Sequence, residues 1–557
     1  MNLKNVWLFF LMFPVLVVPQ NLSLRSNHPV YDFLNILRVK NILPNYEDVV
    51  LPLTRGEIFY QLQNANDSVA SLSEIDKRKL NYFLRYFPSR RASANSFFCN
   101  DSSSLTKHFF SSEENYAYLY QDSLLSFSIA PIVTTKNIYL KDLNDKGRSA
   151  FLFTFGGAFS LEYNDWFAAY LEAWNGILTG EKNAAITDQR VKQSFTFYHT
   201  GIHYFDQTSG YVILKKDIFK LQIGRERILW GVDRFDQSIL NESPQMFDFV
   251  KFDISYKQFS YKFLHGWLVQ PTSTAFVDSL QYDVKSRNPK YIVTSRLGYQ
   301  PFHNLSLGIG QTIIYANSPL ELAYLNPFLL WESAQRSLND LDNSFLHFDS
   351  RYRPCRGLEI NGTLTLDDLN FEFLKKGKWN SAGNRIAWQM GFTSTAPLVF
   401  DRLTLYGDYV QIRPYTYSHP NGGEELTYTN NGFPLGLDLQ PNSAMTSIKV
   451  VYDFNEKLSS SFLFRYTMHG DNIFDSNGKL LKNVGGSIFL STRYFDSPVA
   501  IFLDGEKVTT NFYQLNLRYF LSYNLNVSFQ GQYIRYAKLK NLEERFLSSL
   551  QINYNIY

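Results

Sequence analysis

Residues 513–530, which read YQLNLRYFLSYNLNVSFQ, hold the pattern that decides the fold. Aromatic or aliphatic residues occupy every second position from Tyr513 to Tyr519, and after a short turn they do so again from Leu525 to Phe529. The positions between them are mostly polar, and a period of two residues predicts β-strands with one apolar and one polar face. Two such strands joined by a tight connection form the hairpin unit of a membrane-spanning barrel, whose apolar face meets lipid and whose polar face meets water.

The same alternation recurs along the last four-fifths of the chain. It is clear in residues 151–155, 159–163 and 305–309, and in a last strand over residues 550–556. We therefore expect residues 113–557 to form a barrel, with room for about 16 to 20 strands. A barrel of that width needs a plug or serves as a channel. The chain ends on the aromatic Tyr557, as recognition by the barrel insertion machinery usually requires, although a bulge is needed to bring it into phase with the apolar face.

The first residues predict export across the inner membrane. Lys4 precedes the apolar run 6–18, which has the length of a signal-peptide core and is too short for a comfortable transmembrane helix. We expect residues 1–20 to be the signal peptide, cleaved after Gln20. No second apolar run of about 18 residues follows, which argues against a helical inner-membrane protein. A secreted soluble protein or an outer-membrane barrel remains.

Residues 21–95 have the helical period instead. Apolar residues from Val30 to Leu37 share one helix face, and another such face precedes Pro88. Between them, Thr54 and Glu57 form a T-x-x-E capping box, which satisfies the first free amides of a helix. Three short helices make only a small core, so we expect a periplasmic helical segment that docks on a larger body. The Ser- and Asn-rich residues 96–112 are expected to be a linker.

Composition agrees with a membrane barrel and excludes other classes. Aromatic residues make up 17% of the chain and charged residues 19%, as expected where an apolar outer surface is averaged against a polar lumen. A net charge of +3 is too balanced for a nucleic-acid binder. Cys99 and Cys355 belong to no metal-binding or redox motif, so a disulfide and two unrelated thiols both remain open.

The motifs of common enzyme classes are missing from the sequence. H-E-x-x-H, G-x-S-x-G, P-loop and dinucleotide-binding patterns do not occur. The pairs Asp340/Asp342 and Asp367/Asp368 are the only candidates that we singled out for metal binding or acid/base chemistry, and loop carboxylates are more often solvated turn residues. We expect a protein that is not an enzyme and uses no cofactor and no metal.

Three blocks of the sequence resemble the Wzi-type capsule assembly family. The first block is Gly224-Arg225-Glu226-Arg227-Ile228-Leu229-Trp230-Gly231 with Ser238-Ile239-Leu240 and Phe247-Asp248. The second is Tyr324-Leu325-Asn326-Pro327-Phe328 with Asp342-Asn343 and Leu366-Asp367-Asp368. The third is Arg413-Pro414-Tyr415-Thr416-Tyr417-Ser418-His419 with Tyr428-Thr429-Asn430, Leu435-Gly436 and Pro441-Asn442-Ser443. Where the family usually has WGPG, this chain has Trp230-Gly231-Val232-Asp233, so the turn there is expected to differ.

The resemblance implies an all-β protein of the cell outer membrane: a transmembrane antiparallel β-barrel of about 18 strands with a small N-terminal helical periplasmic segment. It also implies capsular polysaccharide or exopolysaccharide as the partner, besides outer-membrane lipid. A shorter stretch, residues 52–58, is similar to part of an S-layer homology repeat, in which Arg55 would contact glycan. The alternative for that stretch is the helix cap of Thr54 and Glu57.

A barrel that retains an acidic polysaccharide needs cations for its carboxylates and flat rings for its sugar faces. Two groups provide both, and we take them as candidate ligand-binding residues: Arg225, Arg227 and Trp230, and Arg413, Tyr415, Tyr417 and His419. The competing interpretation is structural, because arginines in a lumen usually pair across the wall and Tyr and Trp usually form interfacial girdles.

Three functions follow as hypotheses. The first is a non-enzymatic surface protein that binds or organises exported polysaccharide. The second is a porin or uptake channel for small solutes. The third is a barrel enzyme that acts on lipid or glycan through Asp342, Asp367 and Asp368.

Overall fold

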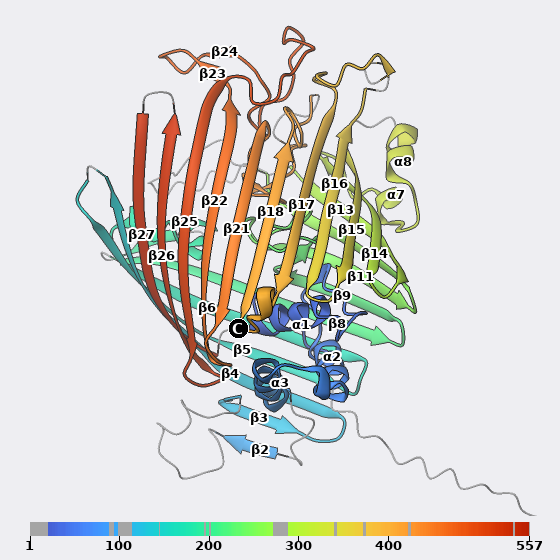
Figure 1. The fold of residues 1–557 in the computed structure, drawn as a ribbon, viewed down its shortest axis with the longest axis vertical. Coiled ribbons are helices and arrows are strands. Elements are labelled where there is room, and N and C mark those ends of the chain that lie inside the picture. The colour runs from blue at the N-terminus through green and yellow to red at the C-terminus, as the bar shows by residue number, and fades with distance from the viewer. Residues whose placement is uncertain are drawn as a thin grey trace, which may run out of the picture.

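The computed structural model describes residues 20–87, 94–97, 114–143, 145–193, 196–199, 202–270, 288–338, 342–370, 372, 375–420, 425–538 and 541–555. Its main body is a closed barrel of 18 antiparallel strands, in which β27 pairs with β4 to complete the circle (Figure 1). The barrel strands are β4 (Leu125–Asp142), β5 (Arg148–Tyr163), β6 (Phe167–Gly180), β8 (Ile202–Lys216), β9 (Phe219–Glu226), β11 (Phe247–Tyr256), β12 (Phe259–Leu268), β13 (Lys290–Phe302), β14 (Leu305–Ala316), β15 (Asn343–Cys355), β16 (Leu358–Asp368), β17 (Arg385–Thr395), β18 (Leu403–Ile412), β21 (Ser443–Asp453), β22 (Leu458–Asp471), β25 (Glu506–Phe520), β26 (Leu525–Lys538) and β27 (Asn541–Tyr554).

Shorter elements complete the fold. The helices are α1 (Pro29–Val39), α2 (Arg55–Asp67), η1 (Val69–Ser71), α3 (Glu74–Tyr86), α5 (Lys182–Ala185), α6 (Gln189–Gln193), α7 (Leu322–Leu325), α8 (Trp331–Leu338) and η2 (Pro397–Val399). The small strands are β1 (Val50–Leu51), β2 (Ala94–Phe97), β3 (Tyr118–Gln121), β7 (Thr196–His199), β10 (Leu229–Trp230), β19 (Thr429–Asn430), β20 (Phe433–Pro434), β23 (Ile473–Phe474) and β24 (Leu480–Lys482). Within the described residues, no helix is long and apolar enough to cross a membrane.

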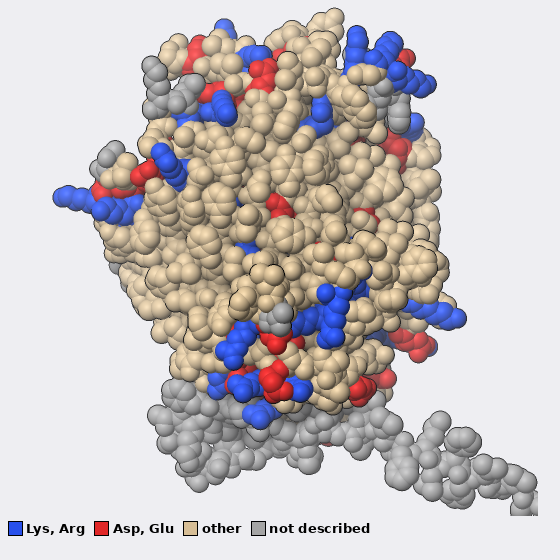
Figure 2. Space-filling view, viewed as in Figure 1, with Lys and Arg blue, Asp and Glu red and all other residues tan. Residues whose placement is uncertain are grey.

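The alternation in the sequence becomes the two faces of the barrel wall. Leu515, Leu517, Phe529, Leu550 and Ile552 point outward and are exposed, while the residues between them face the lumen. Figure 2 shows that Lys, Arg, Asp and Glu gather toward the two ends of the face in view, with a largely uncharged band between them. Such an apolar band is the surface that a membrane barrel presents to acyl chains.

The two ends of the barrel differ. At one end the strands are joined by short turns, such as residues 217–218, 257–258 and 303–304, and at the other end by long loops, such as residues 227–246, 413–442 and 472–505. The helices α1, α2 and α3 lie at the end with short turns (Figure 1). Barrels keep their short turns on the periplasmic side, which makes this the periplasmic end and the loop end the extracellular one.

The expected helices form, with the caps that the sequence encodes. Thr54 and Glu57 make the complete capping box of α2, and Ser73 caps α3. Ala94–Phe97, at the expected border between the helical segment and the linker, forms the short strand β2, which pairs with β3. Residues 151–155 and 159–163 both lie in the single strand β5. Gly156 and Gly157, which stand between them, pair with both neighbouring strands, so no turn interrupts β5.

Several sequence expectations fall outside the described residues. These are the signal peptide through residue 19, Cys99, most of the linker, Asp340 and the terminal Tyr557. Cys355 is an exposed free thiol at the periplasmic end of β15.

Part of the lumen is filled by the chain itself. Trp230, Leu240, Leu435 and Ile488 come from loops of the extracellular end, and they pack in one buried cluster with Val50 from the N-terminal segment. The small strand pair β1–β10 joins these two sources, with Val50 opposite Trp230. Val49 and Val50 of the N-terminal segment and the inward loops therefore form one plug, which the barrel wall surrounds.

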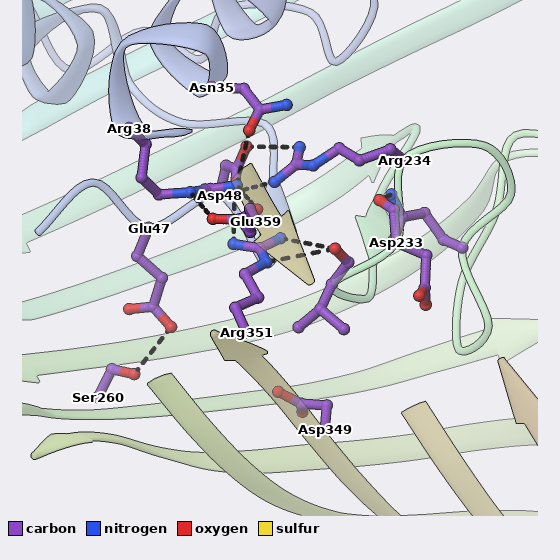
Figure 3. Close-up of polar contacts among 12 residues, drawn as sticks. Asn35, Arg38, Glu47, Asp48, Asp233, Arg234, Ser260, Asp349, Arg351 and Glu359 are labelled. Atoms are coloured by element: carbon purple, nitrogen blue, oxygen red, sulfur yellow. Dashed lines mark hydrogen bonds and ion pairs between the residues drawn. The ribbon is translucent and has the colours of Figure 1, made fainter. Parts of the chain in front are cut away.

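Buried charges fix the plug to the wall (Figure 3). Asp48 of the N-terminal segment accepts hydrogen bonds from Arg38, from Arg234 of an inward loop and from Arg351 of β15. Arg38 also donates to both carboxylate oxygens of Glu359 on β16, at 2.8 and 2.9 Å. Burial alone would raise the pKa of Asp48, but the three guanidinium groups hold it well below its ordinary value.

Candidate functional site

The extracellular loops between β16 and β17, β18 and β21, and β22 and β25 pack together, and we call their described residues outside the plug the loop cap. The Ala382 amide donates a hydrogen bond to the Pro498 carbonyl at 2.9 Å, and the Ala500 amide donates to the Asn380 carbonyl at 2.8 Å. Arg413 donates from its guanidinium group to the carbonyls of Asn384 and Trp379. The loop cap is thus a folded surface above the plug.

Tyr415 and Tyr417 shape the centre of the loop cap. Both adopt left-handed backbone conformations, with φ of 64° and 72°, which cost roughly 1–2 kcal/mol each for non-glycine residues. The surroundings hold them there: the Tyr415 hydroxyl donates to the carbonyl of Asn483, and the Tyr417 amide donates to Asp367 at 2.6 Å. Both side chains are buried, and the Tyr417 ring stacks on that of Tyr428. These buried tyrosines support the loop that carries the site, and they do not face solvent.

A cavity of about 460 Å³ opens beside them, between the loop cap and helix α8. Its lining includes Asp342, Asp367, Asp368 and His419, together with Arg385. The structure thus brings the adjacent carboxylates Asp367 and Asp368 together with Asp342 and His419, which are distant from them in the sequence. Asp367 and Asp342 each accept a hydrogen bond from within the protein, from the Tyr417 amide and the Tyr324 hydroxyl.

His419 is a neutral side chain at the edge of this cavity. Burial, together with the positive charge of Arg385, lowers the pKa of His419 to about 4. At neutral pH the imidazole therefore carries no charge and offers one donor and one acceptor nitrogen. His419 is one of the candidate ligand-binding residues taken from the sequence, and in the cavity it is a neutral hydrogen-bonding group.

Exposed aromatic rings surround the cap, and sequence patterns did not indicate them. Trp379 is 61% exposed, Phe495 75% and Tyr494 fully exposed. The Arg493 guanidinium lies over the Phe495 ring at 4.4 Å, and Trp379 is adjacent to Asn380, which bonds to the Pro498–Ala500 segment. These exposed rings therefore belong to two loops that are distant in the sequence and pair through their backbones. The only signal in the sequence was the presence of aromatic residues in loops.

The first group of candidate residues is divided by the fold. Arg225 points outward from β9 near the extracellular end and pairs with Asp248 at 2.9 Å. Arg227 donates to the carbonyl of Glu242 and to Gln193, which fixes the start of an inward loop. Trp230 is fully buried in the plug. Of the three, Arg225 is the most accessible.

The T-R-G-E stretch of the N-terminal segment has structural contacts. Arg55 pairs with Glu114 at 2.6 Å and donates to the carbonyl of Tyr86. Glu57 accepts from the Thr54 amide and pairs with Lys220 of β9 at 2.9 Å. The capping interpretation of this stretch is confirmed.

Solved structures match this chain with different scores. Wzi of Escherichia coli, described as an outer-membrane protein involved in group 1 capsule assembly and as a carbohydrate-binding β-barrel, is 12% identical, with a TM-score of 0.55 over 96% of this chain and 99% of its own. OprD of Pseudomonas aeruginosa is 12% identical, with a TM-score of 0.40 over 76% of this chain and 94% of its own. OccAB4 of Acinetobacter baumannii is 13% identical, with a TM-score of 0.41 over 76% and 97%.

No family model and no curated protein sequence matches the chain. Nothing in the comparisons supports the likeness to an S-layer homology repeat. The likeness to Wzi extends over the helical segment as well as the barrel, because it covers nearly the whole chain. The fold is therefore that of an outer-membrane β-barrel: 18 antiparallel strands, closed, with a small helical N-terminal segment.

Proposed function

We propose that this protein binds or organises exported capsular polysaccharide or exopolysaccharide at the cell surface, without catalysing a reaction. The observation that carries the proposal is the exposure of Trp379, Tyr494 and Phe495 on the loop cap. Water-exposed aromatic rings that gather on one surface mark an interaction site, and flat rings suit the apolar faces of sugars. Wzi, which shares the fold, is itself a carbohydrate-binding barrel.

The polar groups of the loop cap complement this chemistry. The carboxylates around the cavity accept hydrogen bonds from sugar hydroxyls, and neutral His419 both donates and accepts. Arg413, which is half-buried, and Arg493, whose guanidinium pairs with Asp496, place positive charge near the surface, and this charge favours acidic sugars. The buried Tyr415 and Tyr417 act as positioning residues, since they hold the loop in its shape.

The test removes the two exposed rings from different loops. We expect the double variant Trp379→Ala with Phe495→Ala to bind purified surface polysaccharide about tenfold more weakly, because each ring contributes about 0.5–1.5 kcal/mol in ring contacts. Cells that carry it should release more polysaccharide into the medium with synthesis unchanged. Phe529→Ala, an exposed ring on the lipid-facing wall, is the matched control. Equal retention in the double variant and the control would contradict the proposal.

A second candidate function, solute passage, has an observation of its own. On the inner face of β25, β26 and β27, Gln514 lies opposite Gln532, Asn516 opposite Gln530, and Ser528 opposite Gln551. These side chains are half-exposed, so this side of the lumen is not filled by the plug. An amide wall that also carries Arg518, opposite Ser528, is suited to a polar solute, and the conductance of the protein in planar bilayers separates the two functions.

A further inference from the structure

The loop between β14 and β15 folds over the outside of the barrel. Its described part, residues 317–338, contains α7 and α8, and we call it the outer hairpin. Figure 1 shows α7 and α8 beside the outer surface of the wall, with α8 nearer the extracellular end. On β12, β13 and β14 the outward-facing residues Phe263, Val293, Ile313 and Tyr315 are buried, because Tyr324 and Trp331 of the outer hairpin cover them.

The outer hairpin satisfies polar groups that would otherwise face lipid. Gln311 points outward from β14, donates to the carbonyl of Leu329 at 2.7 Å and accepts from the Trp331 amide at 3.1 Å. The Tyr261 hydroxyl, outward on β12, donates to the carbonyl of Pro327. An amide exposed to hydrocarbon without partners is costly. These contacts fix the hairpin on the wall as part of the folded barrel.

What the hairpin then presents outward is apolar. Leu322 and Phe328 are each 76% exposed and Leu330 is 70% exposed. These side chains continue the lipid-facing band of the wall. Ile309 is exposed on that band, and it lies two positions along β14 from Gln311, which donates a hydrogen bond to the Leu329 carbonyl. The Phe328 ring stacks on that of Tyr261 at 5.5 Å.

The polarity of the outer hairpin changes along its length. The connection between the helices exposes Phe328 and Leu330 beside the single polar residue Asn326, whereas the exposed face of α8 carries Glu332, Ser333 and Arg336. Glu332 and Arg336 form an ion pair at 2.8 Å, and α8 is the helix nearer the extracellular end. This order, apolar below and charged above, is that of a bilayer leaflet from acyl chains to headgroups.

We infer that the outer hairpin is a membrane-interface element, which inserts Leu322, Phe328 and Leu330 among the acyl chains of the outer leaflet and holds α8 at headgroup level. The occupant of this surface is lipid. The inference rests on the barrel and not on polysaccharide binding. It extends the lipid-facing surface of the protein beyond the strands, over a wall region that carries polar side chains.

The test places a fluorescent reporter at single positions of the full-length protein. In a Cys99→Ser, Cys355→Ser background, we attach a polarity-sensitive nitrobenzoxadiazole label at Phe328→Cys, Ser333→Cys or Tyr494→Cys. The proteins are reconstituted in phosphatidylethanolamine–phosphatidylglycerol vesicles with or without acyl-chain nitroxide lipids. Heat-modifiable electrophoretic mobility verifies that each variant has a folded barrel.

We expect blue-shifted emission at position 328 and quenching by acyl-chain nitroxides at least threefold stronger than at position 494 of the loop cap. Position 333 should be intermediate. Emission at 328 equal to that at 494 would overturn the inference. A label at 328 that is shielded from nitroxide lipids, and whose emission changes when protein is diluted in the vesicles, would also overturn it, because a second copy of the chain would then cover the surface.

Discussion

Asp48 illustrates how single buried residues hold this molecule together. Its side chain is fully buried, and Arg38, Arg234 and Arg351 reach it from a helix, an inward loop and a barrel strand. Removing one member of a buried ion cluster leaves the others uncompensated in a medium of low polarity. The same residue therefore links the helical segment, the plug and the wall.

At this scale we predict that Asp48→Asn weakens the docking of the helical segment by about 3–5 kcal/mol, the usual cost of breaking a buried ion pair. Hydrogen exchange of α1, read against that of the barrel strands, measures the effect. Glu74→Gln removes an exposed carboxylate that pairs with Lys77, and should leave the exchange unchanged. Unaltered protection of α1 in the Asp48 variant would contradict this role.

At the scale of elements, the helical segment is a separate unit that is held on the barrel by ionised groups. Glu57 of α2 is partly buried, and although burial alone would raise its pKa, Lys220 of β9 and Lys215 hold it at about 2. His28, which caps α1, is kept neutral in the fold: burial, then the charges of Arg55 and Arg518, lowers its pKa to about 3.

Both kinds of group make the docking weaker in acid. Carboxylates with depressed pKa values stabilise the fold above about pH 4.5, and this contribution is lost as the pH falls toward 2. His28 takes up a proton below about pH 6.5 only when the segment is released, which again favours release on acidification. We predict that α1, α2 and α3 lose exchange protection between pH 6 and pH 3, before the barrel strands do. Equal protection at both pH values, after correction for intrinsic rates, would refute this.

At the scale of the whole molecule, the lumen has two unlike halves. Beside β13, β15 and β16 it is filled by the plug, whereas beside β25, β26 and β27 its amide wall is accessible. The helical segment lies across the periplasmic end, and the loop cap covers the extracellular side of the plug. A path for ions through the accessible half would have to pass the helical segment at the periplasmic end.

We predict that the full chain is nearly silent in planar bilayers, and that removal of residues 29–87 produces discrete conductance steps. The heat-modifiable mobility of the shortened protein verifies that its barrel remains folded. Large, steady conductance of the full chain would instead favour the channel function, because the amide wall would then line an open pore.

The sequence by itself determined the barrel and the helical segment. A period of two, in residues 513–530 and elsewhere, is a local property that assigns every side chain to lipid or lumen, and Thr54 with Glu57 caps a helix through contacts only three residues apart. Such features need no knowledge of distant residues. The family resemblance in the sequence also gave the right strand number, 18.

Only the tertiary structure decided where the candidate site residues lie. Arg225 and Trp230 are neighbours in one motif, yet one points outward from a strand and the other is buried, because the chain leaves the wall between them and turns into the lumen. Trp379 and Phe495 belong to one loop cap because two extracellular loops pair through their backbones. Loop packing depends on contacts between residues far apart in the sequence, and the periodicity of a strand carries no information about it.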